Sequence, residues 1–295
     1  MSEQDRYIPG VPCWIDTQQP DPAAAAKFYA DLFGWDVENV MPPDAGPYFI
    51  GRLNGGDVAG VGSPSEGAPQ EPVWNTYIWV ADADETAAKV RAAGGTVLSE
   101  PFDVGDFGRM AVCADPEGAA FCVWQAGAHR GAAVVNEHGA LNFNGLHTRD
   151  TAAAAAFYGA VFGWELLDWG GGSGAWALPA YGDFLEQRRP GTREGMASMG
   201  APPRFEEVVA SVALIPDDQP DVPAHWSVIF GADDADAIAA KAAELGGEVV
   251  VAPFDAPWVR TTVIRDPQGA TFTASKFVPE NKDMPQPSAG ATAGA

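Results

Sequence analysis

The same aromatic phrase occurs twice in this chain of 295 residues. FYADLFGW begins at Phe28, and FYGAVFGW begins 129 residues later at Phe157. Each phrase ends an alanine-rich segment that follows an aspartate, Asp21 or Asp150. Aspartate is a favourable helix N-cap, alanine favours the helix interior, and glycine favours the position after the helix. The sequence therefore predicts one such helix in each half, with its aromatic side chains buried against its own sheet.

A second pattern also occurs in both halves. Residues 75–97 and 225–249 each read as a strand, an aspartate-rich cap, an alanine-rich helix, a Gly-Gly stop and a strand. Each half closes on an Asp-Pro-x-Gly sequence, at Asp115 and Asp266, which predicts a turn between two strands. Two patterns repeated in both halves predict a duplicated α+β fold.

The repeats also define the expected domain boundaries. Residues 8–126 are predicted to form a first domain, 127–139 a linker and 140–278 a second domain. The second half has about 22 additional residues near 186–209, where mixed Arg and Glu predict an added surface helix. The tail, 279–295, is rich in Pro, Gly, Ala and Ser and is predicted to be disordered.

The charge of the chain argues against several kinds of partner. Lys and Arg number 17, Asp and Glu number 40, and the net charge is -23. Such an acidic surface repels nucleic-acid phosphates and anionic lipids, so we expect neither as a partner. No stretch approaches the ~20 apolar residues of a membrane span, and the N-terminus lacks an apolar signal core, so we expect a cytoplasmic protein. We expect a small-molecule ligand, and a monomer or a homodimer.

The Phe-Tyr and Phe-Gly-Trp of each phrase, together with the Asp-Pro-x-Gly close, resemble the vicinal oxygen chelate superfamily. That superfamily includes glyoxalase I, extradiol dioxygenases and bleomycin-resistance proteins. The resemblance covers the chain from about Val11 to Val278, and it is closest to the tandem glyoxalase-like proteins of actinobacteria. It implies four βαβββ modules in two tandem domains. Modules one and two would form one curved mixed sheet around a cup with helices outside, and modules three and four a second.

The resemblance also identifies where metal-using members of the superfamily place their ligands. Those positions lie on the first strand of a domain, on the first strand of its second module, and in its last strand. Here they carry Trp14, Asn75 and Cys122 in the first half, and Phe143, Ser227 and Thr273 in the second. A metal site of this kind needs about three N, O or S donors of defined geometry. We therefore predict no metal and no other cofactor.

Strand alternation predicts which side chains face the cups. Ile15 would pack against the helix and leave Trp14 and Asp16 for the cup. The predicted ligand-binding residues are Trp14, Asn75, Tyr77, Trp79, Arg109, Cys122, Trp124, Phe143, Ser227, Arg260 and Thr273. Flat apolar walls with a few polar groups suit a planar or hydrophobic small molecule. Alternatively, the aromatic residues fill the first cup, and the second cup, with smaller side chains, is the pocket.

Two residues are predicted to be catalytic, His147 and Asp16. The ordinary pKa of histidine lies near physiological pH, which suits a general acid or base. The alternatives are a strand-end histidine bonded to a backbone carbonyl, and an aspartate that accepts hydrogen bonds near a strand end. Arg109 and Arg260 open matching strands and would clamp a carboxylate or phenolate, or else pair with an acid at the sheet rim.

Three functions remain open at this stage. The first is metal-independent acid–base chemistry of the cyclisation, isomerisation or lyase type on a small, aromatic or hydrophobic metabolite. The second is sequestration of a drug or metabolite without chemistry, as in the bleomycin-resistance branch. The third is a metal-dependent glyoxalase or dioxygenase, which the missing ligands disfavour. A fold alone does not decide among them.

Overall fold

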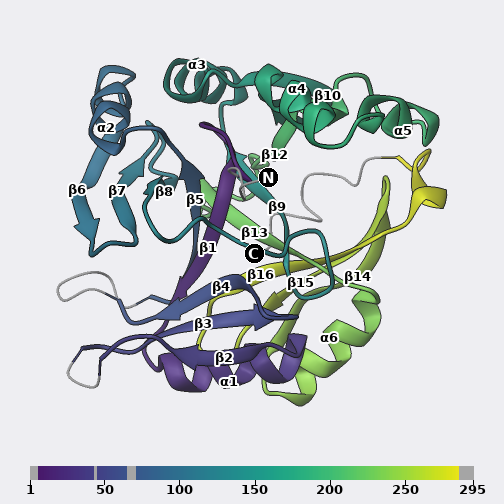
Figure 1. The fold of residues 1–295 in the computed structure, drawn as a ribbon. Coiled ribbons are helices and arrows are strands. Elements are labelled where there is room, and N and C mark those ends of the chain that lie inside the picture. The colour runs from purple at the N-terminus through teal and green to yellow at the C-terminus, as the bar shows by residue number, and fades with distance from the viewer. Residues whose placement is uncertain (1–5, 43–44, 65–70, 286–295) are drawn as a thin grey trace. The chain divides into compact units, whose positions relative to one another are not determined.

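The computed structural model describes residues 6–42, 45–64 and 71–285 (Figure 1). Module one consists of β1 (Pro12–Gln18), α1 (Pro22–Phe33), β2 (Asp36–Asn39), β3 (Tyr48–Leu53) and β4 (Gly56–Gly62). Module two consists of β5 (Val73–Trp79), α2 (Ala83–Ala92), β6 (Thr96–Val104), β7 (Gly108–Ala114) and β8 (Ala120–Ala126). Both follow the predicted order of strand, helix and three strands.

The second half repeats this order with additions. Module three consists of β9 (Leu141–Thr148), α3 (Thr151–Phe162), β10 (Glu165–Gly170), β11 (Ser173–Ala177), α4 (Pro179–Arg188), α5 (Thr192–Ser198), the 3₁₀ turn η1 (Phe205–Glu207) and β12 (Val208–Leu214). Module four consists of β13 (His225–Gly231), α6 (Ala235–Glu244), β14 (Glu248–Ala256), β15 (Val259–Arg265) and β16 (Thr271–Phe277), and the turn η2 (Pro279–Asn281) follows it. The rest of the predicted tail, from residue 286, lies outside the described residues.

The strands form two eight-stranded mixed sheets. Their orders are β2-β3-β4-β1-β5-β8-β7-β6 and β10-β11-β12-β9-β13-β16-β15-β14. Within each module the outer strands pair antiparallel, and the first strand pairs in parallel with the last. The predicted α+β fold of four βαβββ modules is confirmed. Among the described residues, no helix is long and apolar enough to cross a membrane.

The additional residues of the second half lie between β11 and β12. In the first half, β3 and β4 are joined by Asn54 and Gly55 alone, and both have positive φ, as a tight hairpin requires. In the second half, residues 178–207 replace this turn with α4, α5 and η1. The inserted helices thus begin before the predicted range of 186–209.

By their internal contacts, the residues form two compact units. One unit comprises the described residues within 14–76, 132–143 and 227–285, which hold most of modules one and four. The other comprises residues 1–13, 77–131 and 144–226, which hold most of modules two and three. We call them the one–four unit and the two–three unit. Within the first, α1 and α6 lie side by side, as Figure 1 shows.

The helix ends follow the predicted chemistry. The carboxylate of Asp21 accepts a hydrogen bond from the backbone N–H of Ala24, and Asp150 caps α3 in the same way. Gly34 and Gly163 follow the two helices with φ of 77° and 74°, a left-handed conformation that glycine adopts without steric cost. The repeated segments therefore begin and end as the sequence predicts.

The tyrosine of the first phrase is fully buried and bonded to the other half of the sequence. Tyr29 Oη donates to Asp266 Oδ2 (2.7 Å) and accepts from Trp74 Nε1 (3.0 Å). Gln19 Nε2 also donates to Asp266 Oδ2 (2.7 Å). Oδ1 of the same aspartate accepts from three backbone N–H groups of its own Asp-Pro-x-Gly turn. One carboxylate thus connects module four to module one.

The two–three unit contains the matching arrangement. Tyr158 Oη donates to Asp115 Oδ2 (3.1 Å) and accepts from Trp226 Nε1 (3.0 Å). Asp115 Oδ1 accepts from two backbone N–H groups of its turn. Burial raises the pKa of Asp115, and these hydrogen bonds oppose the rise. In each unit, the tyrosine of the aromatic phrase and the aspartate of the Asp-Pro-x-Gly turn are therefore the two partners of one buried hydrogen bond.

The remaining aromatic residues of the phrase are core, as predicted, but they pack on more than their own sheet. Phe33 contacts Phe230 of β13 with ring centroids 4.9 Å apart, and Tyr29 contacts Phe272 of β16 at 5.7 Å. Trp35 Nε1 donates to the backbone oxygen of Gly139 (2.7 Å). The phrase thus packs module one on module four, because rings this large need apolar surface beyond one strand pair.

We predict that Tyr29→Phe lowers the free energy of unfolding by about 1–3 kcal/mol, because a buried carboxylate and a buried indole N–H each lose a partner. Tyr158→Phe should have a similar effect. Urea unfolding measures both. The control is Lys27→Ala, which removes an exposed ion pair with Asp31 and should cost less than about 0.5 kcal/mol. A Tyr29→Phe protein as stable as the control would contradict this account.

Candidate functional site

Module one presents one strand face to its helix and the other away from it. Ile15 and Trp74 belong to the hydrophobic core cluster that includes Phe28 and Tyr29 of α1. Successive strand residues point to opposite faces, so Trp14, Asp16 and Asn75 lie on the face away from α1. This is the face predicted for ligand binding, and we call these three residues with Tyr48 the module-one wall.

Asp16 is the polar centre of the module-one wall. It is 4% exposed, and both of its carboxylate oxygens accept hydrogen bonds. Asn75 Nδ2 donates to Oδ1 (2.8 Å), and Tyr48 Oη donates to Oδ2 (3.0 Å). Trp14 Nε1 in turn donates to Tyr48 Oη at 3.4 Å. The structure therefore brings together three of the predicted site residues around a tyrosine that the sequence analysis missed.

Two glycines of β4 leave the space that the Tyr48 ring occupies. A Cβ atom on Gly60 would lie 2.1 Å from Tyr48 Oη, and one on Gly62 would lie 2.7 Å from the ring. The ring therefore lies across β4 to reach Asp16, which is the strand neighbour of Gly60. The Gly-Val-Gly sequence of 60–62 was the signal that could have identified this contact.

The predicted aromatic lining of module two is buried and packed. Tyr77, Trp79 and Trp124 are 5–7% exposed. Tyr77 contacts Trp124 edge to face at 6.3 Å, and Trp124 Nε1 donates to the backbone oxygen of His129 (3.0 Å). Trp79 stacks on Tyr7 at 5.9 Å. These contacts favour the alternative in which the aromatic residues fill the first cup.

The four other predicted ligand-binding residues also lie on strands. Cys122 pairs with Tyr77 across β5 and β8 and is 3% exposed. Phe143 lies in β9, Ser227 in β13 and Thr273 in β16, and each is half-buried. Their role in ligand binding stays a prediction.

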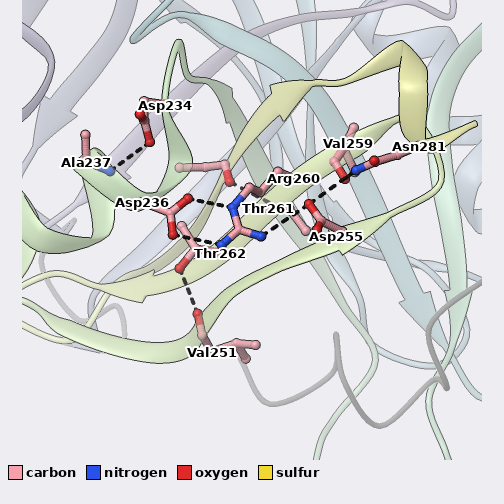
Figure 2. A network of polar contacts seen from close by, with 11 residues as sticks. Asp234, Asp236, Ala237, Val251, Asp255, Val259, Arg260, Thr261, Thr262 and Asn281 are labelled. Carbon is pink, nitrogen blue, oxygen red and sulfur yellow. Dashed lines mark hydrogen bonds and ion pairs between the residues drawn. The ribbon is translucent and has the colours of Figure 1, made fainter. Parts of the chain in front are cut away.

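Arg109 and Arg260 are engaged elsewhere. Arg260 Nε and Nη2 donate to both carboxylate oxygens of Asp236 in α6 (2.5 and 2.8 Å), and Nη1 donates to Asp255 (Figure 2). Hydrogen bonding to Arg260 holds the pKa of Asp236 below its usual range. Arg109 pairs with Asp84 of α2 in the same bidentate way. Asp236 and Asp84 belong to helices, whereas Asp255 belongs to β14, so the guanidinium groups join helix to sheet. Pairing with neighbouring acids is the alternative interpretation.

Module three has an equivalent wall made of small residues and one histidine. Its strand pairing aligns Gly145 with Ser211, and His147 with Ala213. Ser173 pairs with Ala213, as Tyr48 pairs with Gly62 in module one. The module-three wall is therefore Gly145, His147, Ser173, Ala175, Ser211 and Ala213. Where module one has a tyrosine ring over an aspartate, this wall has a serine and a glycine.

A pair of stacked imidazoles borders the module-three wall. The rings of His147 and His225, the first residue of β13, are 4.5 Å apart and inclined by 3°. His225 Nδ1 lies 2.9 Å from the backbone oxygen of Pro223. A carbonyl only accepts, so Nδ1 carries the proton and Nε2 is an acceptor in the neutral ring. That Nε2 is buried without a hydrogen-bond partner among the described residues.

Burial keeps both imidazoles neutral. Desolvation, with a contribution from the neighbouring His225, lowers the pKa of His147 from its ordinary value of 6.5 to about 3. Desolvation also lowers the pKa of His225. A group with a pKa near 3 is unprotonated at neutral pH and is a weak base. The predicted role of His147 as a general acid or base stays a prediction, and a pKa near 3 does not favour it.

The described residues do not fit the metal that the superfamily commonly uses. No group of three His, Cys, Asp or Glu among them converges on one point. The two stacked imidazoles do not form a partial site, because the rings are nearly parallel, with centroids 4.5 Å apart, and the lone pairs of their nitrogens lie in the ring planes. A metal ion needs ring nitrogens that converge at about 2.0–2.1 Å.

The fold and the repeats place the chain in a known class. A model described as "Glyoxalase-like domain" matches residues 14–124, and one described as "Glyoxalase/Bleomycin resistance protein/Dioxygenase superfamily" matches residues 140–273. The chain belongs to this superfamily, as its motifs predict, with two such domains in tandem.

Two curated relatives extend over nearly the whole chain. "Putative glyoxylase CFP32" of Mycobacterium tuberculosis is 41% identical over 284 residues, which are 95% of this chain and 100% of the relative. "Anthracycline biosynthesis protein DnrV" of Streptomyces peucetius is 35% identical over 285 residues, 91% of this chain and 94% of the relative. Each match spans both domains.

Solved structures share the fold at low sequence identity. The Mn(II)-bound glyoxalase from Novosphingobium aromaticivorans has a TM-score of 0.58 at 16% identity, covering 91% of this chain and 83% of that one. The 2,3-dioxygenase LapB from Pseudomonas sp. KL28 has a TM-score of 0.57 at 12% identity, covering 92% and 93%. These similarities confirm the fold.

We predict that His147 makes folding stability depend on pH. Its pKa is about 3 in the folded chain and ordinarily 6.5, so the unfolded chain binds the additional proton between these values. Stability should fall as the pH decreases from 6.5 toward 3. Urea unfolding at pH 7.5, 6 and 5 should therefore show a smaller loss for His147→Leu than for the wild type.

The control for this measurement is Gln18→Leu. Gln18 occupies in module one the position that His147 occupies in module three. Each lies three residues before the aspartate that caps the following helix, and their partners on the neighbouring strand are Gly62 for Gln18 and Ala213 for His147. Glutamine does not titrate, so the Gln18→Leu profile should run parallel to that of the wild type. A His147→Leu profile that also runs parallel would contradict the burial of a neutral imidazole.

Proposed function

We propose that this protein binds one planar aromatic metabolite on the module-three wall and holds it with neutral hydrogen-bonding groups. The observation that carries the proposal is the stacked, uncharged pair of His147 and His225 beside small side chains. The ligand is bound without a metal ion. The protein sequesters or delivers this molecule, which is the second of the functions that the sequence left open.

The shape of the wall supports a flat ligand. Gly145, Ser211 and Ala213 project little beyond the strand backbone, so a ring system can approach the sheet closely. In module one the equivalent surface already carries the ring of Tyr48. A planar ligand on the module-three wall would take the place that a side chain of the chain itself takes in the first half.

The chemistry of the imidazoles supports a ligand with hydroxyl groups. Nε2 of His225 is a buried acceptor that has no described partner, and such a group costs free energy until it is bonded. A phenolic hydroxyl supplies the missing proton donor. Neutral rings also avoid the desolvation cost that a buried charge would impose on binding.

The relatives support a place in secondary metabolism. One relative is named an anthracycline biosynthesis protein, and it matches across both domains of this chain. By extension, we assign the ligand to the class of fused-ring aromatic molecules with hydroxyl groups. A protein that binds such a molecule without changing it can carry it between enzymes or keep it out of solution.

Alizarin, a planar dihydroxyanthraquinone, is a suitable probe of this class. We expect the wild type to bind it with one site per chain in isothermal titration calorimetry. His147→Ala should weaken binding by at least about tenfold, because the ligand loses a hydrogen-bonding partner and a flat surface. EDTA should leave the affinity unchanged, and mass spectrometry should recover the alizarin unaltered.

The matched control is Gln18→Ala, the equivalent position in the first half, which should bind alizarin within about twofold of the wild type. Equal losses in both variants would contradict a site on the module-three wall. Loss of binding in EDTA would contradict the metal-independent part of the proposal. Conversion of the ligand that His147→Ala abolishes would restore the acid–base function in its place.

A further inference from the structure

We propose that Trp14, Asp16 and Asn75 form a second binding site, specific for a phenol, which the chain's own Tyr48 occupies. This site lies in the one–four unit and does not depend on the proposed function of module three. The sequence predicted these residues as part of a larger lining for a planar or hydrophobic small molecule, without the phenol and without Tyr48.

The hydrogen bonds define what the site recognises. The Tyr48 hydroxyl donates to Asp16 Oδ2 at 3.0 Å and accepts from Trp14 Nε1 at 3.4 Å. A hydroxyl is the group that can satisfy a carboxylate and an indole N–H at the same time. An ether oxygen cannot donate to Asp16, and an ammonium group cannot accept from Trp14.

Asn75 acts as a positioning residue in this site. Its Nδ2 donates to Asp16 Oδ1 at 2.8 Å, whereas the phenol donates to Oδ2. This bond fixes the plane of the carboxylate so that Oδ2 faces Tyr48. Asp16 is almost fully buried, so a carboxylate here depends on donors of this kind.

The ring position defines the shape of the site. Tyr48 lies so close to β4 that a single added carbon at Gly60 or Gly62 would collide with it. The two glycines, in alternate positions, leave a recess in the side-chain layer of β4, and the Tyr48 ring fills it. Tyr48 enters the recess from β3, the neighbouring strand, and therefore behaves as a tethered ligand.

Comparison of the two halves supports this assignment. The equivalents of Tyr48 and Asp16 in module three are Ser173 and Gly145, and Ser211 and Ala213 replace the glycines. Module one therefore has the tyrosine, the two glycines beneath its ring and the carboxylate together, and module three has other residues at all four positions. A tyrosine that only filled space would not need the aspartate.

The test removes the tethered ring and supplies a free one. Tyr48→Ala should gain a saturable site for phenol, measured as a rise in Tm with phenol concentration and by calorimetry. Phenol should bind this variant at least about tenfold more tightly than anisole, which cannot donate to Asp16. The wild type should show neither effect, because Tyr48 fills the site.

The double variant Tyr48→Ala, Asp16→Ala is the matched control, and it should lose the preference for phenol over anisole. If Tyr48→Ala is insoluble, refolding with phenol or with anisole replaces the titration, and phenol should recover more soluble protein. Equal effects of phenol and anisole, or equal effects on variant and wild type, would overturn the proposal. His147→Ala leaves the phenol site intact, so failure at module three is distinguishable from failure here.

Discussion

The buried hydrogen bond between a tyrosine of one module and the turn aspartate of another is the contact on which this structure depends. In Asp266 and in Asp115, one carboxylate oxygen accepts hydrogen bonds from backbone N–H groups of the residue's own Asp-Pro-x-Gly turn. The other oxygen accepts from Tyr29 in the case of Asp266 and from Tyr158 in the case of Asp115. The turn is thereby rigid, and the helix that carries the tyrosine is fixed against it. The tyrosine hydroxyl and the aspartate carboxylate are each buried with the other as a hydrogen-bond partner. This explains why the aromatic phrase and the Asp-Pro-x-Gly turn occur the same number of times in the sequence.

With the scaffold held by these contacts, the strand faces away from the helices are free to differ. Module one covers its face with Tyr48 bonded to Asp16, and module two covers its face with packed indole and phenol rings. Module three keeps small side chains and adds the stacked imidazoles of His147 and His225. The Tyr–Asp hydrogen bonds between modules do not involve the strand faces away from the helices. A duplicated fold can therefore fill this face with side chains in one half and use it to bind a ligand in the other half.

Local chemistry made much of the fold predictable. Aspartate caps, alanine-rich helices and Asp-Pro-x-Gly turns act over a few residues, so the sequence shows them directly. The pairing of Tyr29 with Asp266, 237 residues away, has no local signature. The site was predictable only in part. Alternation placed Trp14, Asp16 and Asn75 on one face, but the low pKa of His147 and the helix partners of Arg109 depend on burial and tertiary contacts.

A crystal structure of the protein with bound alizarin tests the central claim most directly. The account predicts the planar ligand against Ser211 and Ala213, hydrogen bonded to the imidazoles of His147 or His225, with Tyr48 still bonded to Asp16. Alizarin in the place of Tyr48 with the module-three wall empty would contradict it. So would a cation coordinated by three side chains between the ligand and the protein.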